Sequence, residues 1–580
     1  ARPFLAEIGL VGRAPGGNVN VVLRSGTNDF HSIFHWFHNN NKLQSLDLFQ
    51  RQNLYNAATG PVTDDKVKSV NPLNILNRFG FTFSGPVYLP KVFNGKNKTF
   101  WLYAFEGLTR PGVERGNSFY TVPDAAARGG DFAGLLRLGT AYQIYDPATI
   151  AAAPNGRFSR QPLPGNIVPA SRIDAVAKNF MPFWPASNTT GTTDGRNNFT
   201  LLPRSLNEFY SHTAKVDHNF NDRHRAFGRY NQTYNLFSSG QVLGTIANGQ
   251  DRFRRNNGIV FDDIIVISPS LLNDFRIGFT RFDQSFFPLS AGYDLNSLGF
   301  HPSLAAGISP QAISFPTINV SAYQNLGTGT NSRSFSNYAT LTDDVSLSRG
   351  NHTLRTGAEF RIYREHNYNF ANMTPTLNFG TTWTQGPLDN SPAAPIGQDF
   401  ASFLLGIPSG GQINVNDSAA EQSLALSFYV QDDWRIRRSL TLNLGLRWDY
   451  DSPITERFNR SVQDFDFTAT NPIAARALAN YAARPIPEIP VSQFRVMGGL
   501  RFAGAGGLDR NLWIPDRNNF APRIGLAWTP MKSTVIRAGY GVFFVPIGAD
   551  RGAVNLSGYS IVNTLVASED NGRTFLASLS

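Results

Sequence analysis

The sequence predicts an all-β protein, a transmembrane antiparallel β-barrel that is incomplete in this chain. Three observations predict this fold: apolar and polar residues alternate along many segments, one kind of hairpin recurs, and short turns alternate with long connections. The segment "LTLNLGLRWDYD" at 440–451 is the clearest case of the first. Four leucines, Trp448 and Tyr450 occupy alternate positions, and Asn443, Arg447 and Asp449 lie between them. This period of two indicates a β-strand with one apolar and one polar face.

A hairpin that contains an acidic pair recurs along the chain. In the segments 259–282, 339–363 and 428–450, a strand with an Asp-Asp pair is followed by a tight polar turn and by a strand with spaced glycine and arginine. The segments 212–234 and 520–544 share this outline without the acidic pair. Repetition of one β-hairpin favours a large sheet built from hairpins.

The connections between these strands alternate in length. Tight turns are predicted near 221–222, 268–270, 349–351, 438–439 and 530–531. Long connections are predicted at about 109–206, 238–256, 288–333, 367–422 and 453–517. Short turns at one rim and long loops at the other are typical of outer-membrane barrels. Strands of about 10 to 12 residues match the tilted span that such a barrel needs.

Alternation assigns each strand an outward and an inward face. One face carries charge in strand after strand, so we expect it to line a polar lumen, and we expect the other face to contact lipid. Trp448 and Tyr450, at one strand end, suit an aromatic girdle. The residues predicted to face outward are Leu354, Thr356, Ala358, Phe360, Ile362, Ile536, Ala538, Tyr540, Val542 and Phe544. Those predicted to face inward are Arg355, Gly357, Glu359, Arg361, Tyr363, Arg537, Gly539, Gly541 and Phe543.

One residue interrupts the pattern. The apolar alternation in "LALSFYVQDDWRI" continues from Leu424 to Val430 and then reaches Asp432. Two explanations are open: a β-bulge resets the register there, or Asp432 lies at headgroup depth near the turn.

Composition excludes several classes of function. The chain has no cysteine, which excludes disulfides, thiol catalysis and cysteine-bound metals. Charged residues make up 16% of the chain, against roughly 25% in typical soluble domains. The net charge of +10 comes from arginines spaced singly along strands, so we expect no nucleic-acid binding. There is no apolar run of membrane-helix length and no signal-peptide pattern, so we expect a mature or cut-out piece.

Three further patterns are interpreted as structural. On a strand, His31 and His35 share a face while His38 takes the other, so we expect lumen or rim histidines and no metal site. Neighbouring aspartates in the Asp-Asp pairs point to opposite faces, which no two-carboxylate mechanism uses. Gly16-Gly17 is followed by neither the Lys-Ser/Thr nor the helix of a phosphate loop. We expect no cofactor and no catalytic residue.

Several motifs, in order along the chain, resemble the TonB-dependent outer-membrane receptors, specifically the Oar-like branch. The segment 12–40 is similar to the end of that family's plug and its first barrel strand. The segments 77–87 and 97–108 resemble the next hairpin, and 166–185 resembles the first large loop. The segment "YVQDDWRIRRSLTLNLGLRWDY" at 429–450 is similar to its most recognisable barrel segment.

The resemblance implies a plugged barrel of roughly 22 strands in the outer membrane of a Gram-negative bacterium, surrounded by lipid and lipopolysaccharide. On this division, residues 1–25 are the remnant of the N-terminal plug and 26–580 are the barrel with long extracellular loops. Roughly 15 or 16 strands are expected in this chain. The sheet should therefore stay open between its first and last strands, with residues 1–17 inside or beneath it. An open sheet edge in lipid leaves backbone N–H and C=O groups without hydrogen-bond partners, which is costly. We therefore expect that this chain does not form a closed native barrel by itself.

The expected function is uptake of a bulky substrate, not enzymatic catalysis. The resemblance implies that the plug rearranges when it couples to the TonB complex through a TonB box missing from this chain. Two alternatives are a passive porin or adhesin-like barrel and a soluble all-β glycan-binding protein or hydrolase. The sequence leaves the substrate open among siderophore, glycan, peptide and protein.

Candidate substrate contacts are predicted in a loop and in the lumen. The loop 109–206 includes "RIDAVAKNFMPFW" at 172–184, a predicted short amphipathic helix. Its aromatic residues either stack on a substrate or pack the loop on itself. The candidate contacts are Phe180, Phe183, Trp184, Arg355, Arg361, Arg447 and Arg537.

Overall fold

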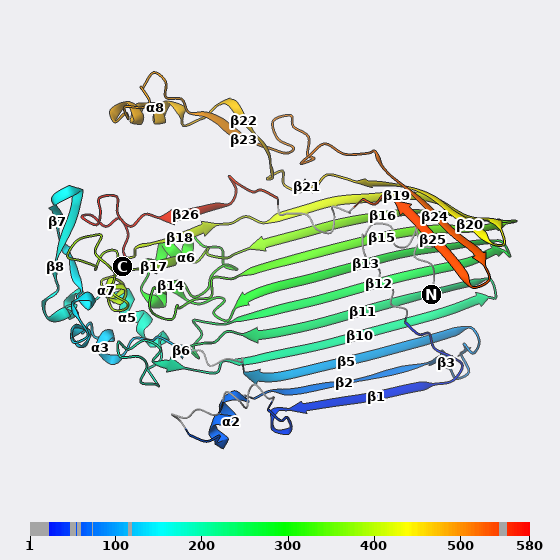
Figure 1. The fold of residues 1–580 in the computed structure, drawn as a ribbon, viewed down its shortest axis with the longest axis horizontal. Helices are drawn as coiled ribbons and strands as arrows, with labels where there is room; N and C mark the ends of the chain where they lie inside the picture. The colour runs from blue at the N-terminus through cyan, green and yellow to red at the C-terminus, as the bar shows by residue number, and fades with distance from the viewer. Residues whose placement is uncertain (1–22, 47–53, 55–59, 72, 114–118, 545–553) are drawn as a thin grey trace.

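The computed structural model describes residues 23–46, 54, 60–71, 73–113, 119–544 and 554–580. These residues form one large antiparallel sheet of 14 strands together with folded loops at one end of it (Figure 1). The sheet strands in order are β1 (His31–Asn40), β2 (Ile75–Pro86), β5 (Thr99–Val113), β10 (Arg204–Asn221), β11 (His224–Ser239), β12 (Gln250–Ser268), β13 (Leu271–Pro288), β15 (Ser332–Arg349), β16 (His352–Asn369), β19 (Ala419–Arg437), β20 (Leu440–Asp451), β24 (Asn519–Met531) and β25 (Thr534–Gly541), with β21 (Thr455–Glu456) paired to β19. The predicted all-β class and antiparallel topology are confirmed.

The alternation of short turns and long loops is also confirmed. The tight turns lie at one end of the sheet, and the long connections gather at the other end (Figure 1). The turn predicted at 530–531 lies two residues later, because β24 continues to Met531. We call the two ends of the sheet the turn end and the loop end.

The predicted strand length holds for β1, β2 and β20, which have 10, 12 and 12 residues, and was wrong for the longer strands between them. Seven strands of the large sheet have 16 to 19 residues, where the sequence suggested about 10 to 12: β10, β11, β12, β13, β15, β16 and β19. At about 3.3 Å per residue, 18 residues extend for roughly 60 Å, about twice the thickness of the hydrocarbon core. The strands therefore continue past the membrane, and hydrophobicity alone cannot mark where they end.

The sheet is open in the described part of the chain, with β1 and β25 as its two edge strands. At the C-terminal edge, β24 and β25 turn across the direction of the other strands (Figure 1). The described part of the chain contributes 14 strands to this sheet, against the roughly 15 or 16 expected. The expected position of residues 1–17 lies outside the described residues.

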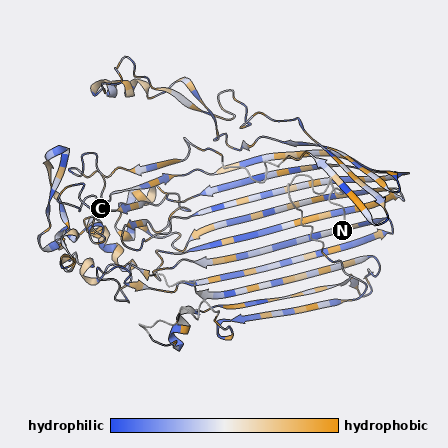
Figure 2. Cartoon of the chain, viewed as in Figure 1, coloured by the Kyte–Doolittle hydropathy of each residue, from blue (hydrophilic) through white to orange (hydrophobic). Residues whose placement is uncertain are grey.

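The outer face of the sheet is apolar, and alternate bands of hydrophobic and hydrophilic residues follow the strands (Figure 2). Residues directly opposite each other on antiparallel neighbours share a face. Two adjacent register rows across β12, β13, β15, β16 and β19 are entirely apolar. The first row is Ile259, Phe279, Ala339, Ile362 and Leu424, and the second is Phe261, Ile277, Leu341, Phe360 and Leu426.

These apolar side chains are exposed, whereas charged residues on the other face are buried. On β20, the exposed fractions of Leu444 and Leu446 are 38% and 44%, against 1% for Arg447 and 2% for Asp449. A water-soluble protein buries the opposite set. The leucines of 440–451 therefore face lipid, and the face that carries Arg447 is called the inner face below.

Asp432 lies on the outer face with no change of register. It is opposite Leu354 and Leu444, and the register of β19 against β20 runs without a shift until Arg435. The Asp432 carboxylate accepts a hydrogen bond from the His352 ring at 2.6 Å, close to the tight turn that precedes β16. Of the two explanations, the structure thus supports the position near the turn.

The long loops contain the remaining elements. The additional strands are β3 (Tyr88–Leu89), β4 (Phe93–Asn94), β6 (Phe119–Tyr120), β7 (Tyr145–Ala153), β8 (Arg157–Pro162), β9 (Phe199–Thr200), β14 (Thr317–Val320), β17 (Thr376–Phe379), β18 (Gly410–Val415), β22 (Val462–Thr470), β23 (Met497–Phe502) and β26 (Ile561–Leu565). The helices are α2 (Asp64–Val70), α3 (Ala125–Arg128), α4 (Ala133–Leu136), α5 (Ala175–Phe180), α6 (Pro302–Ala306), α7 (Gln398–Leu404) and α8 (Ala474–Ala483), besides short 3-10 turns such as η6 (Met181–Phe183). No helix in the described part of the chain is long and apolar enough to cross a membrane.

Three long loops fold together around one hydrophobic core, to which Leu243 and Ala247 of a fourth connection and Leu579 near the end of the chain also contribute. We call the described residues 119–203, 289–331 and 370–418 the loop cap. Its core combines α5 from the first loop with β14 from the second and α7 from the third. The largest enclosed side chains are Phe180, Trp184, Phe315, Ile318, Phe379, Phe400 and Phe403. The cap is therefore one packed unit at the loop end of the sheet.

Candidate functional site

The inner face is lined with polar and charged side chains that contact one another. One register row across nine strands shows its composition. From β5 to β20 it contains Phe100, Asp217, Phe227, Asp262, Arg276, Thr342, Glu359, Ser427 and Asp449. Charges on a wall with little exposed surface need partners, because an unpaired buried charge is costly.

Arg447 is the centre of the most buried cluster on this face. Its Nε donates to Asp449 Oδ1 at 2.9 Å, and a terminal nitrogen donates to Glu359 Oε2 at 3.1 Å across the intervening strand β19. Ser427 donates its hydroxyl to the same Asp449 oxygen at 2.6 Å. Arg361 forms an ion pair with the other oxygen of Glu359. The cluster therefore joins β16, β19 and β20 through two arginines and two carboxylates.

A second set of inner-face contacts continues toward the turn end. Tyr429 donates its hydroxyl to Asp344 at 2.6 Å. Asn443 donates to Asp433 at 2.6 Å. On the neighbouring strands β12 and β13, Arg276 pairs with the buried Asp262 at 2.5 Å. These contacts hold the polar side chains of the inner face in single conformations. The surface of the lumen is therefore polar and preorganised.

The four arginines predicted to face the lumen differ in their surroundings. Arg361 and Arg447 belong to one cluster through Glu359. Arg355 is on the same face, opposite Gln431 of β19. Arg537 is on edge strand β25, opposite Ala527, and is exposed. Asp449 and Ser427 were not among the candidates predicted from the sequence, although Asp449 alternates with Arg447 on the polar face of 440–451.

The aromatic loop candidates lie inside the loop cap. The predicted helix is present as α5, whose N-cap Asp174 accepts hydrogen bonds from two backbone N–H groups. Phe180 and Trp184 are 0% and 1% exposed, and Phe183 is partly buried against the same core. In this structure these side chains pack within the loop cap. Of the two alternatives, stacking on a substrate or packing the loop on itself, the structure shows the second. Phe180 and Trp184 thus present no free ring face to a ligand in this structure.

Polar contacts inside the cap join its three loops. Trp184 Nε1 donates to the carbonyl of Gln324 at 2.7 Å. Asp399, at the start of α7, accepts from the backbone N–H of Ala322 at 2.6 Å, and burial raises the pKa of its carboxyl. Arg172 donates two hydrogen bonds to Asp146, at 2.7 and 2.8 Å, and lowers the pKa of that carboxyl.

The Asp-Asp pairs point to opposite faces, as predicted. Asp262, Asp344 and Asp433 face inward. Their neighbours on the outer face contact polar partners near the turn end. These contacts are Asp263 with His224 at 2.7 Å, Asp343 with Asn273 at 2.5 Å and Asp432 with His352 at 2.6 Å. In the described part of the chain, no group of three His, Cys, Asp or Glu side chains could hold a metal ion.

The segment just before β1 contacts the inner face. Ser25 accepts a hydrogen bond from Lys215 Nζ at 2.9 Å and donates one to Asp217 Oδ1 at 3.0 Å. Lys215 also pairs with Asp217 at 2.7 Å. The chain therefore approaches its first strand along the inner wall of the sheet.

A comparison with protein-family models identifies the class of protein that this fold defines. Residues 22–579 match the outer membrane beta barrel domain. The chain belongs to this family, and its location is the outer membrane. A comparison with curated protein sequences gives no match.

Among solved structures, the chain is similar to outer-membrane transporters and receptors. The outer membrane transporter YddB of Escherichia coli is 9% identical, with a TM-score of 0.39 over 89% of this chain and 52% of that one. A ferric enterobactin receptor (PfeA) mutant of Pseudomonas aeruginosa is 10% identical, with a TM-score of 0.34 over 89% and 45%. The ferric-catecholate import receptor Fiu of E. coli is 10% identical, with a TM-score of 0.24 over 81% and 62%. The chain thus spans about half of their length.

Proposed function

We propose that this chain is the barrel part of a TonB-dependent receptor, of the Oar-like kind, that takes up a bulky substrate across the outer membrane. In this proposal, residues 1–25 are the end of a plug that couples to the TonB complex, and 26–580 are the barrel. The protein moves its substrate and carries out no bond chemistry. The substrate class stays open.

The observation that carries the proposal is the contact of Ser25 with Lys215 and Asp217. A passive porin needs an unobstructed lumen, whereas a plugged transporter holds the segment before its first strand against the inner wall. The hydrogen bonds join this segment to β10 inside the sheet. They support a plug that precedes the barrel and contacts its wall.

The inner face supports transport of a polar substrate. Arg355, Arg361 and Arg537 lie on or beside the wall and offer planar donors that suit carboxylate or phosphate groups. Arg447 is almost fully buried between Glu359 and Asp449, so its role is to hold the wall. We therefore propose Arg355, Arg361 and Arg537, not Arg447, as contacts along the substrate path.

Conductance across a planar lipid bilayer tests the plug against the passive-porin alternative. The complete protein that contains this chain should show no steady conductance. The substitution Lys215→Ala should produce intermittent openings, because it removes a donor that holds Ser25. The control Arg276→Ala breaks another inner-face ion pair that does not involve Ser25.

A steady, ohmic conductance in the unmodified protein would favour the passive porin and reject the proposal. Uptake provides the second measurement. Accumulation of a labelled substrate, identified from a panel of siderophores, glycans and peptides, should stop in cells that lack a functional TonB complex. Uptake that continues unchanged in those cells would contradict energy coupling through TonB.

A further inference from the structure

Beyond the last apolar rows, the outer face becomes polar and basic along one register row. This row is Asn257, Arg281, Asn337, Arg364 and Gln422. Each of its members lies two residues nearer the loop end than an apolar residue of the preceding row. The apolar surface therefore ends at the same level on five adjacent strands, which is the level of the lipid headgroups.

Exposed arginines gather at and just above this row. Arg281 and Arg364 belong to the row itself. Arg255 and Arg333 follow on β12 and β15, and both face outward by register with β13 and β16. At the turn end, the outer face instead carries Asp263, Asp343 and Asp432. The outer face thus carries Arg255, Arg281, Arg333 and Arg364 toward the loop end, where Arg333 pairs with Asp283 at 3.2 Å, and the three aspartates toward the turn end.

A hollow of about 410 Å³ opens within this basic region. Arg364 and His366 of β16 and Arg457 and Arg510 of the following loop contribute its positive or ionisable side chains. Its other lining residues are Ala420, Glu421, Gln422 and Thr455. Glu421 alternates with the outward residues Ala420 and Gln422, so its side chain is on the inner side of β19. Arg364, Arg457 and Arg510 form no ion pair with another described residue.

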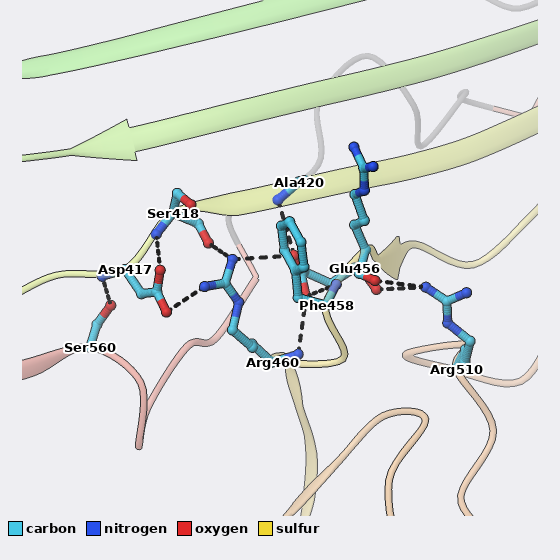
Figure 3. A network of polar contacts seen from close by, with 9 residues as sticks. Asp417, Ser418, Ala420, Glu456, Phe458, Arg460, Arg510 and Ser560 are labelled. Carbon is cyan, nitrogen blue, oxygen red and sulfur yellow. Dashed lines mark hydrogen bonds and ion pairs between the residues drawn. The ribbon is translucent and has the colours of Figure 1, made fainter.

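The loop that presents two of these arginines is held rigidly. Glu456, 2% exposed, accepts backbone hydrogen bonds from Ala420, Phe458 and Arg460 at 3.1, 2.8 and 3.0 Å (Figure 3). Arg510 donates to the carbonyl of Glu456 at 2.9 Å. A further ion pair joins Arg460 to Asp417. The backbone at Arg457 and the guanidinium of Arg510 are therefore held in place before any ligand arrives.

We propose that this hollow binds a phosphate group of an outer-leaflet lipid, with the lipid's acyl chains lying on the apolar rows below. Guanidinium groups bind phosphate with planar, charge-assisted hydrogen bonds. Exposed basic side chains at headgroup level attract anionic lipid. The apolar surface that continues from the hollow along Ile362 and Leu424 distinguishes a lipid from a free phosphate ion. Membership of an outer-membrane family places such lipids around this face.

Native mass spectrometry of the complete protein in detergent, titrated with lipid A that carries two phosphates, tests the proposal. The double variant Arg364→Gln/Arg457→Gln should bind lipid A about tenfold more weakly. The control Arg437→Gln/Arg438→Gln removes two exposed arginines at the turn end and should change the affinity less than about twofold. If the double variant does not fold, as judged by circular dichroism, the single variant Arg457→Gln replaces it.

Two chemical probes separate the possible ligands. Dephosphorylated lipid A should bind the unmodified protein as weakly as the double variant binds lipid A, and millimolar inorganic phosphate should not displace lipid A. Equal affinity of the unmodified protein and the double variant would overturn the site. Displacement by inorganic phosphate would overturn the assignment to a lipid.

Discussion

Arg447 of β20 donates to Glu359 of β16 at 3.1 Å, across the whole width of strand β19. The same guanidinium donates to Asp449 at 2.9 Å. This ion pair joins two strands that are not neighbours and passes over the inner face of β19. Ser427 of β19 also belongs to the cluster, because its hydroxyl donates to Asp449. Three strands are thus joined on the inner face by side chains, in addition to their backbone hydrogen bonds.

Removal of this arginine should be strongly destabilising. The substitution Arg447→Met leaves Glu359 with one of its two arginine partners and removes the ion pair between Arg447 and Asp449, in a region with little solvent. We expect a loss of about 3–5 kcal/mol in the free energy of unfolding. Urea unfolding of the protein in detergent, followed by tryptophan fluorescence, measures it.

The matched control is Arg537→Met on edge strand β25, where the side chain is exposed and no ion pair with a described residue is present. It should cost less than about 0.5 kcal/mol. Equal losses for the two variants would show that the buried cluster has no special part in stability.

The two faces of β20 should respond differently to a new charge. Leu444→Arg places a charge in lipid and should cost about 2–4 kcal/mol near the bilayer midplane, with a smaller cost nearer the headgroups. Asn443→Arg faces the lumen and should cost much less. Unfolding in lipid vesicles measures both, and similar penalties would favour a packed core on both faces.

The fold was predictable where local pattern determines it. Alternation in 440–451 and the tight turns fixed the sheet, its faces and the end at which each loop emerges. The loop cap was not predictable, because Trp184 packs against residues more than 200 positions away, such as Phe400 and Phe403. The outward position of Asp432 could not be predicted from the alternation within β19 alone, since it depends on a contact with His352 of the neighbouring strand β16.

The loop cap should depend on its aromatic core. Trp184→Ala removes a buried indole that contacts two other rings, so we expect a loss of about 3–5 kcal/mol in cap stability. Limited proteolysis within 119–203 should become correspondingly faster. Leu138→Ala, at an exposed site of the same segment, should leave the rate unchanged. Unchanged proteolysis of Trp184→Ala would contradict a common core for the three loops.

The Asp146–Arg172 pair should make cap stability depend on pH. The pKa of Asp146 is lowered in the folded cap, first by its hydrogen bonds from Arg172, so the pair stabilises the cap above the ordinary carboxyl pKa of 3.8. This contribution is lost as the pH falls through the lowered, folded-state pKa.

Comparison with Arg172→Gln isolates this pair from other carboxyls such as Asp399, whose pKa is shifted upward. Hydrogen exchange of amides in β7 and β8 should show a difference of about 1 kcal/mol between the two proteins at pH 6. The difference should vanish in strong acid. A difference that persists at low pH would mean that Arg172 acts through packing and not through the carboxylate.

The assignment of inside and outside is tested most directly by single cysteines, which are unambiguous because the chain has none of its own. Spin labels are attached in turn at Leu444, Phe360, Asn443 and Glu359, with the protein in lipid bilayers. Labels at Leu444 and Phe360 should collide with oxygen dissolved in lipid, and labels at Asn443 and Glu359 should collide with a water-soluble relaxation agent. Equal accessibility to the water-soluble agent at all four positions would contradict the barrel.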